Sequence, residues 1–359
     1  MDISKIEKVS ISSKDGILSC KTTLEIATES QLQFAFYIFR NFERIHTEWY
    51  SSSNVFEFDT QGKPGCYHVQ GFAKLEDQSV IQSTSSSIFL NALKITKEDF
   101  SDADKNLIAY SLNCGRWTFP ALYYPSEKKN LFVLMPSAVN RSKSSIPAFN
   151  RWKWAVEGIF PGSVLCISDP TLELHDELEL GWLLGTKENC ATTALSQFVT
   201  KIAEANEIPV ENIVTYGSSA GGFSALSLSA CIDGSVAVAI NAQVDAIAYK
   251  VTPQVDLVSK MCFGMPKESV RLDFSSRVDM TTRWRDVKNS RAFLVQNIDD
   301  WHHHNVHFKP LWASLGGDPG QEGVAFAGRH IAWVHRQEGG HVPETKEMAK
   351  KIIEILDIY

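Results

Sequence analysis

A serine set among glycines is the residue of this sequence best suited to covalent chemistry. Ser219 lies in the run Tyr-Gly-Ser-Ser-Ala-Gly-Gly at 216–222, which follows the apolar run 213–215 and leads into the helix-like stretch 223–229. A strand that turns at once into a helix, with small residues two before and two after a serine, is typical of a nucleophile elbow. A bare Gly-x-Ser-x-Gly also occurs as a small-residue loop, but the flanking strand and helix favour the elbow. The sequence therefore predicts Ser219 as a nucleophile.

The register of the elbow follows from sterics. The tight turn needs very small residues at both flanking positions, and Ser219 has Gly217 and Gly221 there. The neighbouring Ser218 would have a tyrosine and an alanine at the same positions, which fits the turn less well. We therefore assign the nucleophile to Ser219 rather than to Ser218.

A base for this serine is expected near the end of the chain. A serine hydroxyl is a poor nucleophile until a positioned base takes its proton, and a carboxylate must fix the tautomer of that base. In such a topology the acid follows a late strand and the histidine follows the last one. His341 lies on a Gly-Gly loop between the terminal strand 331–334 and a terminal helix, so it is the predicted base. His335 is a weaker candidate because it lies nearer the strand body, and a solvated loop histidine is the alternative role for His341.

The acid that would orient this histidine has three candidates. A predicted strand ends at Asn297, and Asp299 and Asp300 follow it. Asp300 lies three residues past the strand end, a common placement for the acid, so we prefer it to Asp299. Asp245, at the end of an earlier strand, is the third candidate. Any of the three could instead cap a turn, which is a common role of aspartate.

A run of histidines next to these aspartates invites a metal interpretation. The run contains His302, His303, His304 and His307. Consecutive histidines cannot all face one point on a regular element, and no glutamate or cysteine completes a known ligand spacing. We expect neither a metal nor another cofactor, and we interpret the run as solvated or substrate-facing.

An oxyanion hole is expected beside the predicted elbow. Its first donor would be the backbone N–H of Ala220, the residue after the nucleophile. A second N–H would come from the loop after the strand that ends at Met135, where Ser137 or Ala138 is the natural donor. A small residue there lets the backbone approach a substrate closely.

The N-terminal part of the chain predicts a separate β domain, residues 1–95. Apolar residues at 32–39 alternate with a period of two, and further strand-like stretches follow at 48–50, 55–58 and 67–72. Several short strands separated by turn-rich pieces suggest a small antiparallel sandwich. The polar stretch 82–87 is interpreted as its end or as a linker.

Residues 96–359 predict an α/β domain that would position the chemistry. Strand-like runs alternate with helical segments, which is typical of βαβ units and a mostly parallel sheet flanked by helices. The apolar positions between 194 and 203 have helical spacing, and so do those between 346 and 356. The predicted strands are 117–124, 131–135, 164–167, 213–215, 236–240, 292–296 and 331–334.

Composition limits the classes of function. The 359 residues are 44% hydrophobic and 21% charged, which is ordinary for a globular protein, and the net charge of −7 argues against a nucleic-acid partner. The N-terminal residues lack the apolar region of a secretory signal, and no apolar run is long enough for a membrane span. The seven cysteines are scattered, odd in number and without a Cys-x-x-Cys pair, as expected for thiols in a reducing compartment. We therefore expect a cytoplasmic location.

These residues together resemble the α/β-hydrolase superfamily over about 117–359. The segment 217–221, Asp300 and His341 match its motifs position by position. Within the superfamily, the chain resembles a bacterial group found with capsule and surface-glycan biosynthesis, and it is similar in layout to the accessory secretion proteins that help to O-acetylate adhesin glycans. The stretches that carry this resemblance are 135–138, 167–170, 181–185 and 339–343.

The expected function is serine-dependent acyl transfer through an acyl-Ser219 intermediate. His341 would act as general base and then general acid, and Asp300 would orient it. The enzyme would be an esterase or an O-acyl(acetyl)transferase, and the resemblance implies an acyl donor and a carbohydrate or glycan acceptor. A non-catalytic glycan-binding or scaffold protein on the same fold is the alternative, and a metal-dependent hydrolase is a third.

Overall fold

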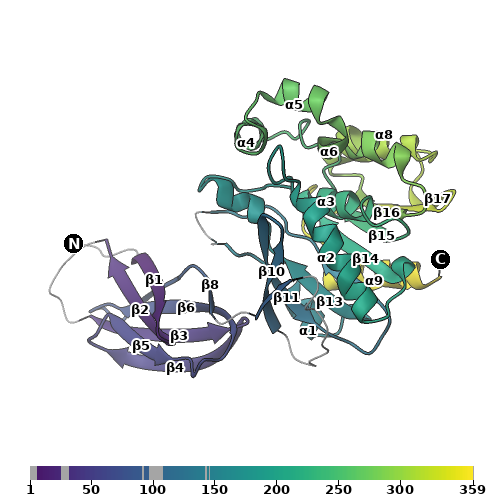
Figure 1. Ribbon diagram of the computed structural model, residues 1–359. Helices are drawn as coiled ribbons and strands as arrows, with labels where there is room; N and C mark the ends of the chain where they lie inside the picture. Colours follow the sequence, from purple (N-terminus) through teal and green to yellow (C-terminus); the bar gives the residue numbers. More distant parts are fainter. Residues whose placement is uncertain are drawn as a thin grey trace. The chain divides into compact units, whose positions relative to one another are not determined.

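The computed structural model shows two compact units along the chain (Figure 1). The first consists mainly of residues up to Leu93, together with the short segment Ile108–Tyr110, and the second consists mainly of residues from Lys94 onward. Residues 1–5, on which the expectation about a secretory signal depends, lie outside the described residues. The structure describes residues 6–25, 32–90, 93–96, 108–141, 144 and 146–358.

The first unit contains two antiparallel sheets. Its strands are β1 Ile6–Lys14, β2 Ile17–Leu24, β3 Gln33–Arg40, β4 Glu43–Ser51, β5 Val55–Asp59, β6 Gly65–Lys74, β7 Val80–Thr84 and β8 Ile88–Leu90. The three-stranded sheet has the order β1-β2-β5. The five-stranded sheet has the order β4-β3-β6-β7, and β8 pairs with β6.

Side chains from both sheets share one apolar core. Leu18 of β2 and Phe36 and Tyr67 of the larger sheet are almost completely buried in a single cluster. The rings of Phe36 and Phe56 stack across the two sheets with their centroids 6.1 Å apart. Two antiparallel sheets around a common core agree in part with the predicted small sandwich.

One interpretation within this unit was wrong. The polar stretch 82–87 was interpreted as the end of the sandwich or as a linker, but residues 82–84 belong to β7 and pair with β6. The side chains of β7 alternate between half-buried and exposed positions. A strand at the edge of a sheet tolerates polar residues because water reaches one of its faces and its outer edge, so the polar composition did not indicate a linker.

The second unit is built on a ten-stranded sheet. Its strands are β9 Leu93–Thr96, β10 Ile108–Cys114, β11 Trp117–Tyr124, β12 Leu131–Leu134, β13 Ser163–Ile167, β14 Ile213–Ser218, β15 Val236–Ile240, β16 Arg291–Asn297, β17 Gly323–Ala327 and β18 His330–His335. They lie in the order β17-β18-β16-β15-β14-β12-β13-β11-β10-β9. The strands from β13 through β12, β14, β15 and β16 to β18 are parallel, and β11 and β17 pair with their neighbours in the antiparallel sense. The predicted mostly parallel sheet is confirmed.

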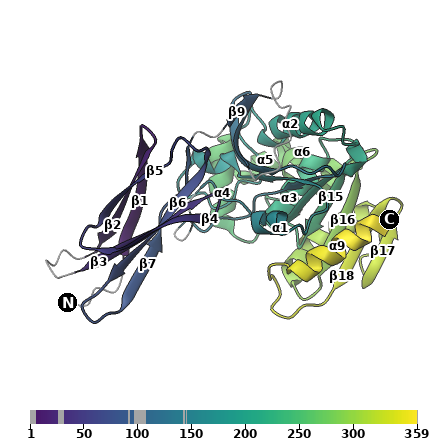
Figure 2. The same cartoon turned by 90° about the horizontal axis from the view of Figure 1, so that it is seen from below.

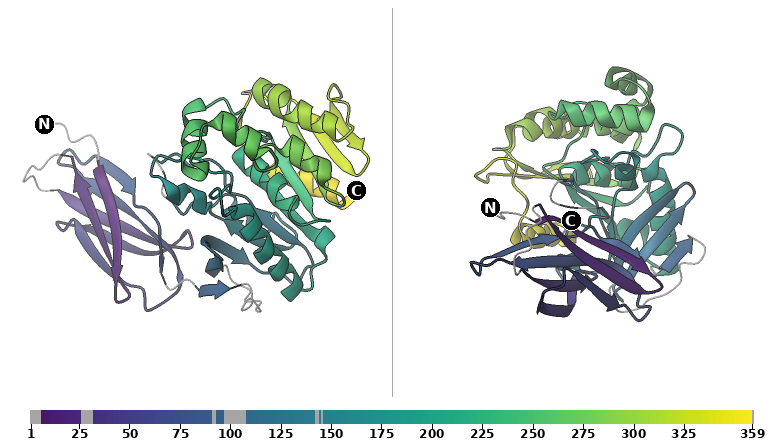
Figure 3. Two further views of the ribbon diagram at one scale, coloured as in Figure 1. Left: turned by 45° about the horizontal axis from the view of Figure 1, so that its top comes forward. Right: turned by 90° about the vertical axis from the view of Figure 1, so that its left-hand side faces the viewer.

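Helices connect these strands. They are α1 Trp152–Val156, η1 Pro170–Leu174, α2 Ala191–Ala205, η2 Val210–Asn212, α3 Ala220–Ser229, α4 Thr252–Val258, η3 Ser259–Phe263, α5 Lys267–Asp273, α6 Ser275–Val278, α7 Met280–Arg283, η4 Trp284–Asp286, η5 His303–Phe308, α8 Lys309–Ser314 and α9 Lys346–Ile358. The short helices between β15 and β16, drawn in green, gather on one side of this unit (Figure 3). Among the residues that the structure describes, no helix is long and apolar enough to cross a bilayer.

The apolar pattern of the sequence explains the core of the second unit. All five residues of β15 are buried, as expected for a central parallel strand that is covered on both faces. The helix α2 buries Leu195, Phe198 and Ile202 along one stripe. At the C-terminal end, α9 lies near β18 (Figure 2). The Lys351 ammonium is 4.4 Å from the centre of the Trp333 ring.

The strand order places a switch point of the sheet beside the predicted nucleophile. The strand β12 lies between β13 and β14. The chain continues from β12 to its neighbour on one side, β13, and then to its neighbour on the other side, β14. In open α/β sheets, ligands bind outside the carboxyl ends of the strands at such a switch point. The loop with Ser137 follows β12 and Ser219 follows β14. Both predicted elements of the site therefore meet at this edge.

Candidate active site

Ser219 occupies a sharp turn between β14 and α3. The strand ends at Ser218 and the helix begins at Ala220, so Ser219 alone makes the turn, with φ 54° and ψ −122°. A positive φ is uncommon for a residue with a side chain, and such strain is found at functional sites. Two backbone hydrogen bonds hold the turn: Ser219 N–H donates to Ile240 O at 2.9 Å, and Gln243 N–H donates to Ser219 O at 3.2 Å.

Glycines allow the strand and the helix to approach each other at this turn. A Cβ atom on Gly217 would overlap the carbonyl of Gly221, and a Cβ on Gly222 would lie 2.5 Å from the Cβ of Ala242. A Cβ on Gly221 would come to 3.0 Å from the carbonyl oxygen of Pro136, in the loop after β12. The close packing accounts for the glycines of the motif and brings the loop after β12 against the elbow.

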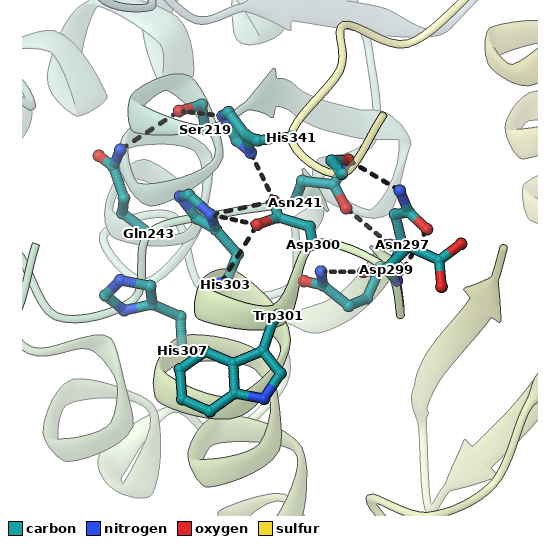
Figure 4. A network of polar contacts seen from close by, with 12 residues as sticks. Ser219, Asn241, Gln243, Asn297, Asp299, Asp300, Trp301, His303, His307 and His341 are labelled. Atoms are coloured by element: carbon teal, nitrogen blue, oxygen red, sulfur yellow. Dashed lines mark hydrogen bonds and ion pairs between the residues drawn. The ribbon is translucent and has the colours of Figure 1, made fainter. Parts of the chain in front are cut away.

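His341 and Asp300 form a line of hydrogen bonds with Ser219 (Figure 4). The Nε2 of His341 is 3.1 Å from the Oγ of Ser219, and its Nδ1 is 2.5 Å from the Oδ2 of Asp300. A carboxylate can only accept, so His341 donates through Nδ1–H, and its Nε2 is free to accept the serine proton. Asp300 is 4% exposed, whereas the His341 side chain is 35% exposed, so the base faces the solvent side of the site.

The other two candidate acids lie apart from this line. Asp299 forms an ion pair with Arg336 at 3.3 Å. Asp245 pairs with Arg271 at 2.6 Å, and its carboxylate also accepts hydrogen bonds from two backbone N–H groups of the following turn. The structure therefore brings Asp300 to His341 and gives Asp299 and Asp245 other partners.

A second histidine shares the carboxylate of Asp300. The Nδ1 of His303 lies 3.0 Å from Asp300 Oδ1, and its ring stacks on that of His341 with centroids 4.1 Å apart and planes 12° apart. Burial alone would raise the pKa of Asp300, but the hydrogen bonds from His303 and His341 outweigh it and hold this pKa well below its ordinary value. Burial lowers the pKa of His303. A neutral His303 donating to an ionised Asp300 fits both shifts.

Asn297 connects the loops that carry the acid and the base. Its Nδ2 donates to Gln337 O at 2.7 Å and to Gly340 O at 2.8 Å, next to His341. Its Oδ1 accepts from the backbone N–H groups of Asp299 and Gln337. This fully buried amide fixes the two loops relative to each other. The sequence marked Asn297 only as a strand end.

Two backbone N–H groups were predicted to form the oxyanion hole. Ala220 is the first residue of α3, and the first N–H groups of a helix have no partner within that helix. In the loop after β12, the Ser137 N–H already donates to Asn150 Oδ1 at 3.1 Å, and Ala138 is exposed. The Ser137 N–H is thus already engaged, and Ala138 stays the other predicted donor.

A buried ion pair lies behind the elbow. The guanidinium of Arg151 pairs with the carboxylate of Glu344, and its Nη2 donates to Ser218 Oγ at 2.6 Å. The two charged side chains are 8% and 2% exposed. Burial would raise the pKa of Glu344, but the charge of Arg151 outweighs it and lowers this pKa. The pair joins the start of α1 to the loop that follows His341.

Gln243 contacts Ser219 directly and Trp182 contacts Gln243, and neither residue was assigned a role at the site from the sequence. The Nε2 of Gln243 is 3.2 Å from Ser219 Oγ, and the indole Nε1 of Trp182 is 2.6 Å from Gln243 Oε1. Trp182 lies in the stretch 181–185 that carries the family resemblance, but no role was predicted for it. Both side chains are almost completely buried.

The histidine run was expected to be solvated or substrate-facing, but His303, His304 and His307 are buried. The rings of His302, His303 and His307 pack together with centroids 5.1 to 5.4 Å apart, whereas His304 stacks on Phe308. His303 hydrogen-bonds Asp300, while the Nδ1 of His307 accepts from Val244 N–H at 3.3 Å. Within the described part of the chain, the one group with metal-ligand spacing is Asp300, His303 and His341, whose ligand atoms lie within 4.8 Å of one another. Because the Nδ1–H groups of both histidines already donate to the carboxylate, this cluster fits a hydrogen-bonded acid and base better than a cation site.

Comparison with solved structures places the chain among proteins with an α/β-hydrolase-like fold. The capsule O-acetyltransferase of Neisseria meningitidis serogroup A matches 72% of this chain and 97% of its own, at 14% identity and a TM-score of 0.52. A histidine-to-alanine mutant of that protein in complex with CoA matches 72% and 98%, at 13% identity and a TM-score of 0.51. A puromycin hydrolase mutant complexed with PGG matches 81% of this chain and 45% of its own, at 16% identity and a TM-score of 0.50.

Sequence comparison adds no closer assignment. No protein-family profile matches the chain, and no curated protein matches it. At identities of 13–16%, the structural likeness shows a shared fold. The α/β-hydrolase fold expected from the elbow is thereby supported for this chain.

Proposed function

We propose that this protein is an acyl-transfer enzyme that works through an acyl-Ser219 intermediate. The observation that carries the proposal is the unbroken line from Ser219 Oγ through His341 to the buried carboxylate of Asp300. A nucleophile, a base and an orienting acid in this geometry are the parts that acyl transfer requires.

The chemistry follows from these groups. Ser219 Oγ bonds to the carbonyl carbon of the acyl donor while His341 Nε2 takes its proton, and the carbonyl electron pair moves onto the oxygen held by backbone N–H groups. When the bond to the leaving oxygen or sulfur breaks, that atom takes the proton from His341. An acceptor hydroxyl then gives its proton to His341 and bonds to the acyl carbon. The bond from that carbon to Ser219 Oγ breaks, and Oγ takes the proton back from His341. Water as the acceptor gives an esterase, and a sugar hydroxyl gives a transferase.

We favour a carbohydrate or glycan hydroxyl as the acceptor. Support comes from the four sequence stretches that resemble proteins of surface-glycan biosynthesis, together with the fold shared with a capsule O-acetyltransferase. All seven cysteines lie among the described residues and are thiols rather than disulfides, which supports a reducing compartment. We place the protein in the cytoplasm on that basis.

A fluorophosphonate probe tests the nucleophile. We expect the purified protein to be labelled and Ser219→Ala to remain unlabelled. Ser218→Ala is the matched control, because it removes the neighbouring hydroxyl of the same turn and should leave labelling in place. Equal labelling of wild type and Ser219→Ala would overturn the proposal.

Two further measurements separate the alternatives. A non-catalytic glycan-binding protein would hydrolyse p-nitrophenyl acetate equally slowly as wild type and as His341→Ala, whereas an enzyme would lose turnover in the variant. Activity that survives EDTA would exclude a metal-dependent hydrolase. Intact-mass detection of the adduct on Ser219, with and without candidate glycans, would give the acyl mass and show which acceptor discharges it.

A further inference from the structure

The line of hydrogen bonds at the site continues beyond Ser219. Gln243 Nε2 lies 3.2 Å from Ser219 Oγ (Figure 4). On the other side of the same amide, Trp182 Nε1 lies 2.6 Å from Gln243 Oε1. Gln243 follows β15 and Trp182 follows η1 by eight residues, so neither belongs to the loops that carry the acid and the base. Five side chains therefore form one chain of contacts, from Trp182 to Asp300.

The donor at one end of this chain fixes the orientation of Gln243. An amide side chain can be turned by 180° with little change in shape, so its partners decide which end faces where. The indole N–H of Trp182 can only donate, and it must therefore face the amide oxygen of Gln243. The NH₂ group of Gln243, which can only donate, is then left facing Ser219.

This orientation decides where the serine proton goes. The hydroxyl of Ser219 has one proton and two lone pairs. Because the NH₂ of Gln243 cannot accept that proton, the hydroxyl accepts from Gln243 and donates to His341 Nε2. His341 in turn donates from Nδ1 to Asp300. Every hydrogen bond from Trp182 to Asp300 then points in the same direction, the one needed for proton transfer to His341.

The backbone that presents Trp182 is strained and firmly held. Trp182 and Leu183 have φ of 52° and 54°, two consecutive left-handed residues with side chains. The buried carboxylate of Asp169 accepts a hydrogen bond from Leu183 N–H at 2.9 Å, and Thr192 Oγ donates to Leu183 O at 3.0 Å. Strained backbone persists only where the surroundings over-determine it, so the indole is kept at a defined place.

We propose that Gln243, oriented by Trp182, is a positioning residue that sets the direction of the Ser219 hydroxyl. The inference rests on the proposed function and deepens it, because it adds to the serine, histidine and aspartate a group that decides which partner receives the serine proton. The Gln243 N–H also supports negative charge on Oγ as the proton leaves.

The replacement Gln243→Glu tests whether this side chain sets the direction of the Ser219 hydroxyl, because it changes the shape of the side chain very little. The ionised carboxylate that it introduces would accept the serine proton in competition with His341, so we expect probe labelling at pH 8 to be about a hundredfold slower than in wild type. Burial raises the pKa of a carboxyl group, and a protonated carboxyl can donate to Ser219 as the amide does. The deficit should therefore shrink as the pH falls. Gln243→Met, which keeps the length without polar atoms, should be about tenfold slower at every pH.

The controls separate an effect on the direction of the Ser219 hydroxyl from an effect on the packing around Gln243. Gln70→Glu makes the same charge change on the exposed face of β6 and should label like wild type, and thermal unfolding reports whether each variant is folded. Trp182→Phe keeps a ring but removes the N–H, and it should slow labelling as Gln243→Met does. If Gln243→Glu and Gln243→Met show the same deficit at all pH values, or no deficit, Gln243 does not set the direction. Absence of labelling in the wild type would contradict the proposed function itself.

Discussion

His303 is the residue near the catalytic line whose position was least expected from the sequence. It was one member of a histidine run, yet it donates to Asp300 and stacks on His341. Its N–H disperses part of the charge of the carboxylate, which is one of the causes of the lowered pKa of Asp300. The charge on Asp300 that is left to attract a protonated His341 is therefore smaller than it would be without His303.

Replacing His303 should slow the reaction. In His303→Leu, the Asp300 carboxylate loses a hydrogen bond and the His341 ring loses the imidazole that stacks on it, so both are held less firmly. Probe labelling should be roughly tenfold slower than in wild type. His303→Asn can still donate from the position of Nδ1 and should label at close to the wild-type rate. Equal labelling rates for His303→Leu and wild type would show that this hydrogen bond does not act on the site.

At the scale of elements, loops after β12, β14, β16 and β18 converge on the switch point of the sheet. The buried pair of Arg151 and Glu344 connects two of the segments that surround it. Each charge is tolerated in the interior only because the other is present. Removing one partner of a buried pair costs more than replacing both with apolar side chains of similar size.

A comparison of a single and a double variant of this pair tests its structural role. Glu344→Gln leaves the Arg151 guanidinium buried without its counter-charge, and should lower the free energy of unfolding by about 3–5 kcal/mol. The double variant Arg151→Met with Glu344→Met should lose less, as measured by urea unfolding. Glu207→Gln breaks the exposed pair with Lys129 and serves as a control, with an expected loss below about 1 kcal/mol. A double variant less stable than Glu344→Gln would contradict this account.

The elements also show which parts of the site a sequence reveals. The place of Ser219 in a tight turn could be predicted because its glycines act within that turn, and the place of His341 on a loop because a Gly-Gly pair follows the last strand. Gln243 and Arg151 were not predictable, since their partners Trp182 and Glu344 lie 61 and 193 residues away and no local spacing relates them. Asp299 and Asp300 are neighbours, and the hydrogen bonds of Asn297 decide how their turn is arranged. The short helices between β15 and β16 were missed because no sustained apolar period marks them.

At the scale of the whole molecule, buried histidines couple stability to pH. Burial lowers the pKa of His307 to about 3, of His68 to about 4 and of His330 to about 4. An unfolded histidine titrates near its ordinary pKa of about 6.5. Between that pH and the lowered pKa values, the unfolded chain therefore binds more protons than the folded one. The stability contributed by the neutral histidines is fully present above about pH 6.5 and is lost as the pH falls.

His307→Asn should reduce this sensitivity to acid. The amide oxygen of asparagine can replace Nδ1 as the acceptor for Val244 N–H but does not titrate. Between pH 7.5 and pH 5, the free energy of unfolding of wild type should fall by roughly 2 kcal/mol more than that of the variant. Urea unfolding at the two pH values measures the difference, and the comparison at pH 7.5 removes any packing effect. Parallel losses in wild type and variant would contradict the assignment.

The hydrogen bonds at Ser219 also join residues that are far apart along the chain. His341 lies 122 residues from Ser219 and 41 residues from Asp300. Contacts of such long range require large loops to close and are associated with slow folding. Under the proposed function, Ser219 is reactive only in molecules that have completed these closures. The fraction of a preparation that a serine probe labels is then a direct count of its correctly folded molecules, which a measurement of secondary-structure content alone does not provide.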